Sequence, residues 1–94
     1  MQTVERRVLV VEDERTIADA VAARLRAEGF HVQVAGDGPG AVAAARRTPP
    51  DAIVLDVMLP GMNGFETCRR LRESGVWAPV LMLTARDAVE DRVA

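Results

Sequence analysis

Four short apolar runs, separated by longer segments with helical spacing, constrain the fold of this chain most strongly. Three of them are continuous, at residues 8–11, 52–55 and 80–83, whereas residues 30–35 alternate apolar and polar side chains. Continuous runs are typical of strands buried on both faces of a parallel sheet, and alternation is typical of a strand with one wetter face. Strands that alternate with helices predict an α/β fold with a doubly wound parallel sheet.

The order of the strands follows from these patterns. The alternating second strand is expected at an edge of the sheet, which gives the order 2-1-3-4 and places strands one and three side by side. Helices are expected over about residues 15–28, 39–47 and 64–73. The inward faces of the first and third helices are expected to carry Ile17, Val21 and Leu25, and Phe65, Cys68 and Leu71; Trp77 is expected to cover the core beneath the third helix.

Acidic residues follow the two strands that are expected to be neighbours. Glu12 and Asp13 come directly after the first strand, and Asp56 ends the third. Ligands of open α/β sheets bind at the carboxyl ends of the strands, where these side chains would meet. Crowded carboxylates repel one another unless a cation lies between them, and Mg²⁺ typically binds one or two carboxylates and several waters. The sequence therefore predicts a Mg²⁺ site beside Asp56, whose carboxylate could accept a phosphoryl group.

Two further residues are expected at the same edge. The main-chain carbonyl of Met58, two residues after Asp56, could supply another oxygen ligand to the metal. Thr84 ends the fourth strand, and its hydroxyl could donate to a phosphoryl oxygen. A hydroxyl that is reoriented by a new dianion is a plausible switch element.

Three segments carry a resemblance to a known family. Residues 10–14 (VVEDE), 55–64 (LDVMLPGMNG) and 83–86 (LTAR) resemble the receiver domain of two-component response regulators, of the type that precedes a winged-helix DNA-binding domain. The resemblance covers essentially the whole chain. It implies a flavodoxin-like fold, phosphorylation of Asp56 by a sensor histidine kinase, dependence on Mg²⁺ and the switching of a transcriptional output in the cytoplasm.

The chain departs from this family in its last part. Family members continue through a fourth helix to a fifth strand that ends in a lysine, and this sequence contains no lysine. The expectation is therefore a receiver domain at residues 1–94 that is incomplete at the C-terminus, lacks the fifth strand and the last helix, and is impaired in switching. The fourth strand is then expected to be an apolar edge that associates as a dimer or a swapped oligomer.

Other function classes find less support. The net charge of −2 and the scattered arginines predict no direct contact with nucleic acid, and no apolar stretch approaches the length of a membrane span. In phosphatases with an aspartate nucleophile, a second aspartate lies two residues after the first. Met58 stands at that place here, so we expect no enzyme. A nucleotide-binding domain would need a glycine-rich loop after the first strand, where acidic residues stand instead. A pure interaction module that no longer takes phosphate is the remaining alternative.

Overall fold

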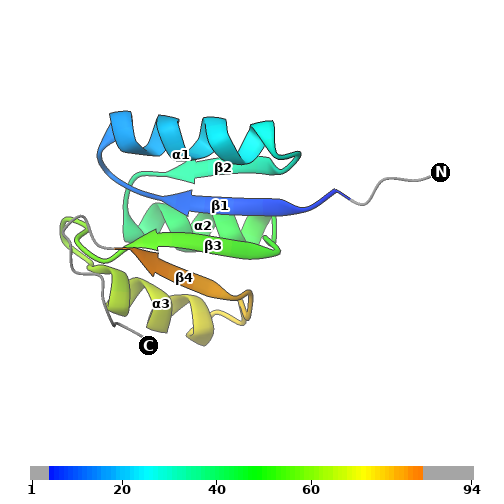
Figure 1. Cartoon of the computed structure of the whole chain (residues 1–94). Coiled ribbons are helices and arrows are strands. Elements are labelled where there is room, and N and C mark those ends of the chain that lie inside the picture. Colours follow the sequence, from blue (N-terminus) through cyan, green and yellow to red (C-terminus); the bar gives the residue numbers. More distant parts are fainter. Residues whose placement is uncertain (1–4, 84–94) are drawn as a thin grey trace.

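The structure is a computed structural model that describes residues 5–83. Four parallel strands form one sheet in the order β2-β1-β3-β4 (Figure 1), which confirms the predicted topology. The elements in chain order are β1 (Arg7–Val11), α1 (Arg15–Ala27), β2 (His31–Ala35), α2 (Gly38–Arg47), β3 (Ala52–Asp56), α3 (Gly64–Glu73) and β4 (Val80–Leu83). The expected lack of a fifth strand and a last helix concerns residues after Leu83, which lie outside the described part of the chain.

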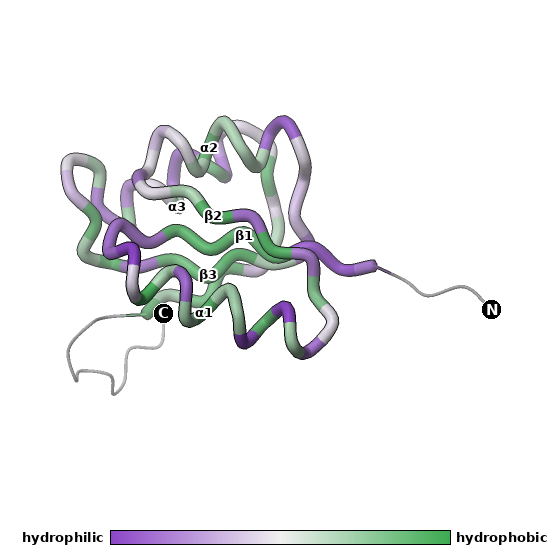
Figure 2. The backbone as a smooth tube through the Cα atoms, turned by 90° about the horizontal axis from the view of Figure 1, so that it is seen from above, coloured by the Kyte–Doolittle hydropathy of each residue, from purple (hydrophilic) through white to green (hydrophobic). Residues whose placement is uncertain are grey.

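The helices cover the two faces of the sheet. Figure 2 shows the apolar strands in the middle, with α1 on one side and α2 and α3 on the other. Side-chain caps start two of these helices: Asp37 accepts a hydrogen bond from the Gly40 amide at 2.7 Å, and Asn63 accepts one from the Glu66 amide at 2.9 Å. Such caps satisfy main-chain donors that have no partner within the helix. They fix where α2 and α3 begin, close to the carboxyl edge of the sheet.

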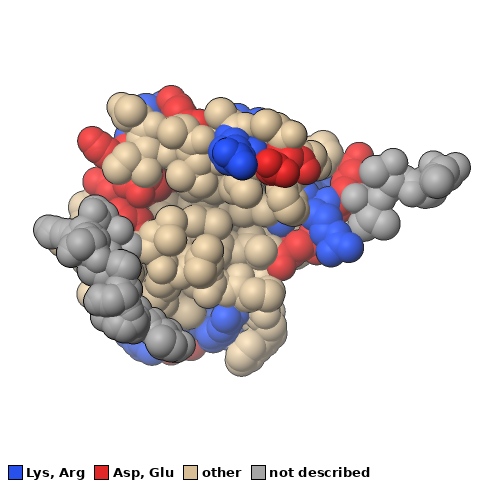
Figure 3. Space-filling model, in the orientation of Figure 1, with Lys and Arg blue, Asp and Glu red and all other residues tan. Residues whose placement is uncertain are grey.

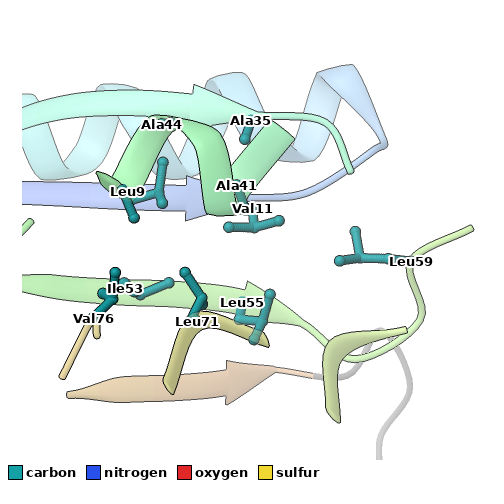
Figure 4. Packing of buried hydrophobic residues seen from close by; sticks show 11 residues of the cluster. Leu9, Val11, Ala35, Ala41, Ala44, Ile53, Leu55, Leu59, Leu71 and Val76 are labelled. Atoms are coloured by element: carbon teal, nitrogen blue, oxygen red, sulfur yellow. The ribbon is translucent and has the colours of Figure 1, made fainter. Parts of the chain in front are cut away.

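The core lies between the sheet and the two helices α2 and α3. Side chains from β1 and β3 pack there against small residues of α2 and against α3 (Figure 4); they include Leu9, Val11, Ile53, Leu55, Ala41, Ala44 and Leu71. Because alanines have short side chains, α2 can lie close to the sheet. β1 and β3 pair in the register Val11 with Leu55. The residues that follow this pair, Glu12 and Asp56, therefore emerge together at one edge.

The inward face of α1 differs from the predicted one. Ala18 and Ala22 are the buried residues of this helix, whereas Ile17 is 44% exposed. A spacing of four residues drifts around a helix with 3.6 residues per turn, so apolar spacing alone did not fix which neighbouring stripe faces the sheet. The prediction of Ile17 as an inward residue was wrong.

The region from α3 to β4 holds two more differences. Thr67 and Leu71 are buried in α3 while Phe65 is exposed, and Trp77 is 72% exposed rather than covering the core. The guanidinium of Arg72 donates hydrogen bonds to the carbonyls of Val76 and Ala78, at 3.0 and 2.7 Å, and lies 5.5 Å from the centre of the Trp77 ring. The Trp77 ring thus lies on the outside of the loop, in cation–π contact with Arg72.

The outer strand β4 is apolar and partly uncovered. Leu81 is 61% exposed and Leu83 is also exposed, and their register with Val54 and Asp56 places both on the α1 face of the sheet. Within residues 5–83, no helix is long and apolar enough to cross a bilayer. Association through the β4 edge stays a prediction.

Candidate functional site

Three carboxylates meet at the carboxyl edge of the sheet, as the sequence predicted. Glu12, Asp13 and Asp56 each bring one carboxylate oxygen to within 4.8 Å of the others. We call these three residues the acidic cluster. In Figure 3, acidic atoms gather on the side toward which the strands of Figure 1 point. Since all three groups are oxygen ligands, the cluster matches the ligand chemistry of a hard divalent cation.

Asp56 is the most deeply placed member of the cluster. It is 8% exposed and ends β3, an inner strand of the sheet. Its Oδ1 atom accepts a hydrogen bond from the main-chain N–H of Met58 at 3.0 Å. The Val57 N–H donates to the Leu83 carbonyl, and the Gly64 N–H donates to the Val57 carbonyl, both at 2.9 Å. The carboxylate is therefore held by a loop that is fixed at both of its ends.

Glu12 and Asp13 stand at the end of β1. The Glu12 N–H donates to the Ala35 carbonyl of β2 at 3.0 Å, and its Oε2 accepts from the Glu14 N–H at 3.1 Å. Glu12 is half-buried, whereas Asp13 is exposed. Among residues 5–83, no arginine or histidine forms an ion pair with any member of the acidic cluster. The negative charge of the cluster is thus not balanced by the described side chains.

The protonation of Glu12 reflects its burial and the charges beside it. Partial burial raises the pKa of Glu12 above its ordinary value of 4.5, and the negative charges of Asp56 and Asp13 raise it further. The hydrogen bond from the Glu14 N–H lowers the pKa in part. Burial and like charges both disfavour the ionised form of a carboxyl group. A cation among the three carboxylates would relieve this repulsion.

Glu12→Gln is expected to stabilise the metal-free chain at neutral pH. A carboxyl group whose pKa is raised by folding contributes stability below its unfolded pKa and loses that contribution as the pH rises through the folded pKa. The gain in melting temperature should therefore be present at pH 7 and disappear as the pH falls below 4.5. Thermal unfolding in a chelator across this range measures it. A gain that is equal at all pH values would show that the ionisation of Glu12 is not its cause.

The other two predicted site residues have different outcomes. Met58 lies at the site, and its amide binds the Asp56 carboxylate, a role that sequence reasoning missed. A main-chain donor has no signature in residue type, so no sequence signal could have revealed it. The use of the Met58 carbonyl as a metal ligand stays a prediction. Thr84, the predicted switch hydroxyl, lies outside the described residues.

The comparison with protein families agrees with this geometry. The family model described as "Response regulator receiver domain" matches residues 8–94. The chain belongs to this family.

The receiver domain has many curated relatives that are named as regulators. The probable transcriptional regulatory protein TcrX of Mycobacterium tuberculosis is 55% identical over 87 residues, which cover 93% of this chain and 37% of TcrX. The DNA-binding response regulator MtrA of Mycobacterium bovis is 48% identical over 94 residues, which cover 99% of this chain and 40% of MtrA. The receiver domain thus spans well under half the length of these relatives.

Solved structures share its fold. Chemotaxis protein CheY4 of Vibrio cholerae has a TM-score of 0.85 and 35% identity, covering 93% of this chain and 74% of that one. Response regulator protein TrrA of Thermotoga maritima, solved in complex with Mg²⁺ and BeF, has a TM-score of 0.81 and 30% identity, covering 87% of this chain and 71% of that one. These likenesses agree with the flavodoxin-like topology of the sheet.

Proposed function

We propose that this receiver domain is a phosphoacceptor, in which Asp56 takes a phosphoryl group from a sensor histidine kinase in a Mg²⁺-dependent reaction. The observation that carries the proposal is the acidic cluster, whose carboxylate oxygens lie within 4.8 Å of one another around a buried aspartate. Burial and the neighbouring charges of Asp56 and Asp13 raise the pKa of Glu12, and a cation at this place would offset both. The structure solved with Mg²⁺ and BeF belongs to a relative with the same fold.

The proposed reaction needs little covalent chemistry from the protein. A carboxylate oxygen of Asp56 forms a bond to phosphorus as the N–P bond of the donor phosphohistidine breaks, and the departing imidazole nitrogen takes a proton from water. The Met58 N–H holds Oδ1 of Asp56, so the carboxylate is oriented before the donor arrives. Orientation and charge neutralisation supply most of the catalysis in phosphoryl transfer.

Asp13 and Asp56 would hold the metal ion directly, with the Met58 carbonyl as a further ligand and Glu12 acting through water. Bound Mg²⁺ supplies positive charge that neutralises the phosphoryl oxygens. The three carboxylates present, one exposed and one half-buried, fit an ion that keeps several of its waters. We also propose Thr84 as the switch hydroxyl, because it follows Leu83, the residue that pairs in register with Asp56.

The partners follow from the family and the relatives. The relatives TcrX and MtrA are named as a transcriptional regulatory protein and a DNA-binding response regulator. The residues that match this chain make up less than half of each of them. We propose that the full-length protein carries a DNA-binding domain, that a sensor histidine kinase is the phosphoryl donor, and that both meet the receiver domain in the cytoplasm. The phosphoryl group on Asp56 would then switch a transcriptional output.

Acetyl phosphate, a small phosphodonor, tests the proposal without the kinase. With Mg²⁺ present, intact-mass spectrometry should show one phosphoryl group per chain, and the label should be lost when a chelator removes the metal. Asp13→Asn should slow labelling by on the order of tenfold or more, because it removes a carboxylate from the metal site. Asp19→Asn, an exposed aspartate of α1, is the matched control and should label as the unchanged chain does. Labelling that is independent of Mg²⁺ would contradict the proposed metal site.

A further inference from the structure

The first turn of α2 lies against the loop that follows Asp56. Gly38, the first residue of α2, is buried, and a Cβ atom placed on it would lie 2.5 Å from Oγ1 of Thr67 and 2.8 Å from Sδ of Met62. Carbon and oxygen atoms that are not bonded rarely approach below about 3 Å. Glycine is therefore the residue type that fits at this point without displacing its neighbours.

The two residues that face Gly38 belong to the loop and to the start of α3. Thr67 is fully buried, and its Oγ1 donates a hydrogen bond to the Asn63 carbonyl at 2.8 Å. Asn63 in turn caps α3 by accepting from the Glu66 N–H. Met62 is half-buried beside it. Since Thr67 is locked by packing and by a hydrogen bond, an added atom on Gly38 would push the loop rather than move one flexible side chain.

The same loop returns to the backbone of the phosphoacceptor. A Cβ atom on Gly64 would lie 2.7 Å from the main-chain oxygen of Asp56 and 2.7 Å from Cα of Val57. The Gly64 N–H also donates to the Val57 carbonyl at 2.9 Å. Two close approaches therefore connect α2 with the site. Gly38 lies against Met62 and Thr67, and Gly64 lies against the main chain of Asp56.

We propose that Gly38 is a positioning residue for the acidic cluster. Its missing side chain lets the first turn of α2 hold residues 57–64 in the place where the Met58 N–H orients the Asp56 carboxylate. Gly38 touches neither the metal nor the phosphoryl group and acts through Met62 and Thr67. The inference rests on the proposed function, because the property that it sets is the binding of Mg²⁺.

Gly38→Ala tests this role, with Gly36→Ala as the matched control. A Cβ atom on Gly36 would meet no atom within 4 Å, and Gly36 is exposed and has no positive φ. Mg²⁺ titration followed by amide NMR should show binding weaker by on the order of tenfold in Gly38→Ala, the range found when groups behind metal ligands are changed. Gly36→Ala should bind as the unchanged chain does.

A second readout needs no metal. In the metal-free chain, the amide resonances of Met58 and Asp56 should shift in Gly38→Ala and stay in place in Gly36→Ala.

Adding Thr67→Ala to Gly38→Ala removes the oxygen at 2.5 Å and should restore most of the Mg²⁺ affinity, with Thr67→Ala alone as the reference. Two close atoms of Met62 then remain, Sδ at 2.8 Å and Cβ at 3.0 Å, of which Sδ is the far end of a flexible side chain. Urea unfolding of the same variants shows whether the recovered affinity exceeds what recovered stability alone would give.

The outcomes separate the inference from the proposed function. If the unchanged chain binds no Mg²⁺, the proposed function fails. If it binds and a folded Gly38→Ala chain binds equally well, with unshifted Met58 and Asp56 resonances, the positioning role is overturned. If Gly38→Ala does not fold, Met62→Ala decides. This variant removes the Met62 side chain from the contact with Gly38 and adds no atom that could clash. It should bind Mg²⁺ several-fold more weakly, and unchanged affinity would overturn the inference.

Discussion

Asp56→Asn is expected to abolish the covalent phosphorylation of the chain by acetyl phosphate in the presence of Mg²⁺. A neutral amide is a poor nucleophile and cannot form the acyl phosphate that a carboxylate forms. Asparagine keeps the size of the side chain and an oxygen that can accept from the Met58 N–H, so the loop around the site should stay folded. Intact-mass spectrometry at a series of reaction times measures the label.

Asp37→Asn is the control for this experiment. Asp37 is exposed and lies just after β2, at the same edge of the sheet, but it is not a member of the acidic cluster. Its side chain caps α2, and asparagine caps helices about equally well. Labelling should be unchanged in this variant. Label that persists in Asp56→Asn would place the phosphoacceptor on another residue.

The second large effect concerns the core beneath the site. Leu55→Ala is expected to lower the free energy of unfolding by about 2–5 kcal/mol, because it loses apolar burial and leaves a cavity. Leu55 has 0% exposure and directly precedes Asp56 on β3. A loss of this size is a large part of the stability of a small domain. Urea unfolding followed by far-UV circular dichroism gives the value.

The same substitution on the neighbouring strand provides the control. Leu81→Ala on β4 removes a side chain that is 61% exposed on the α1 face, so its cost should be about 0.5 kcal/mol. If the two variants lose equal stability, Leu81 is covered in solution by another surface. That result would favour the predicted association through β4, and sedimentation at several concentrations would then test it.

Sequence patterns predicted the topology and the acidic cluster for the same physical reason. Continuous apolar runs need burial on both faces, which placed the strands that precede Glu12 and Asp56 inside the sheet. Once these strands are neighbours and parallel, their carboxyl ends must meet at one edge. The proximity of Glu12, Asp13 and Asp56 therefore follows from order and direction alone.

Details that depend on packing could not be predicted in this way. The periodicity of α3 favoured Phe65 as an inward residue, but buried Thr67 faces Gly38 across a contact that leaves no room for a larger side chain. This contact joins residues 29 positions apart, and no local pattern reports it. Trp77 was assigned to the core for its size, yet it is 72% exposed and its ring lies against the guanidinium of Arg72.

The place of Trp77 decides how this protein can be observed by spectroscopy. Trp77 precedes the first residue of β4 in the chain, whereas Leu83, the last residue of that strand, pairs in register with Asp56. At about 3.3 Å per residue, β4 alone puts about 10 Å between its first residue and the level of the acidic cluster, and Trp77 lies before that first residue. Because the ring is already surrounded largely by water, its emission reports neither the arrival of a cation nor the loss of the core with much contrast. The main-chain amides of the loop after Asp56 are the natural reporters, since one of them already binds the carboxylate whose chemistry is in question.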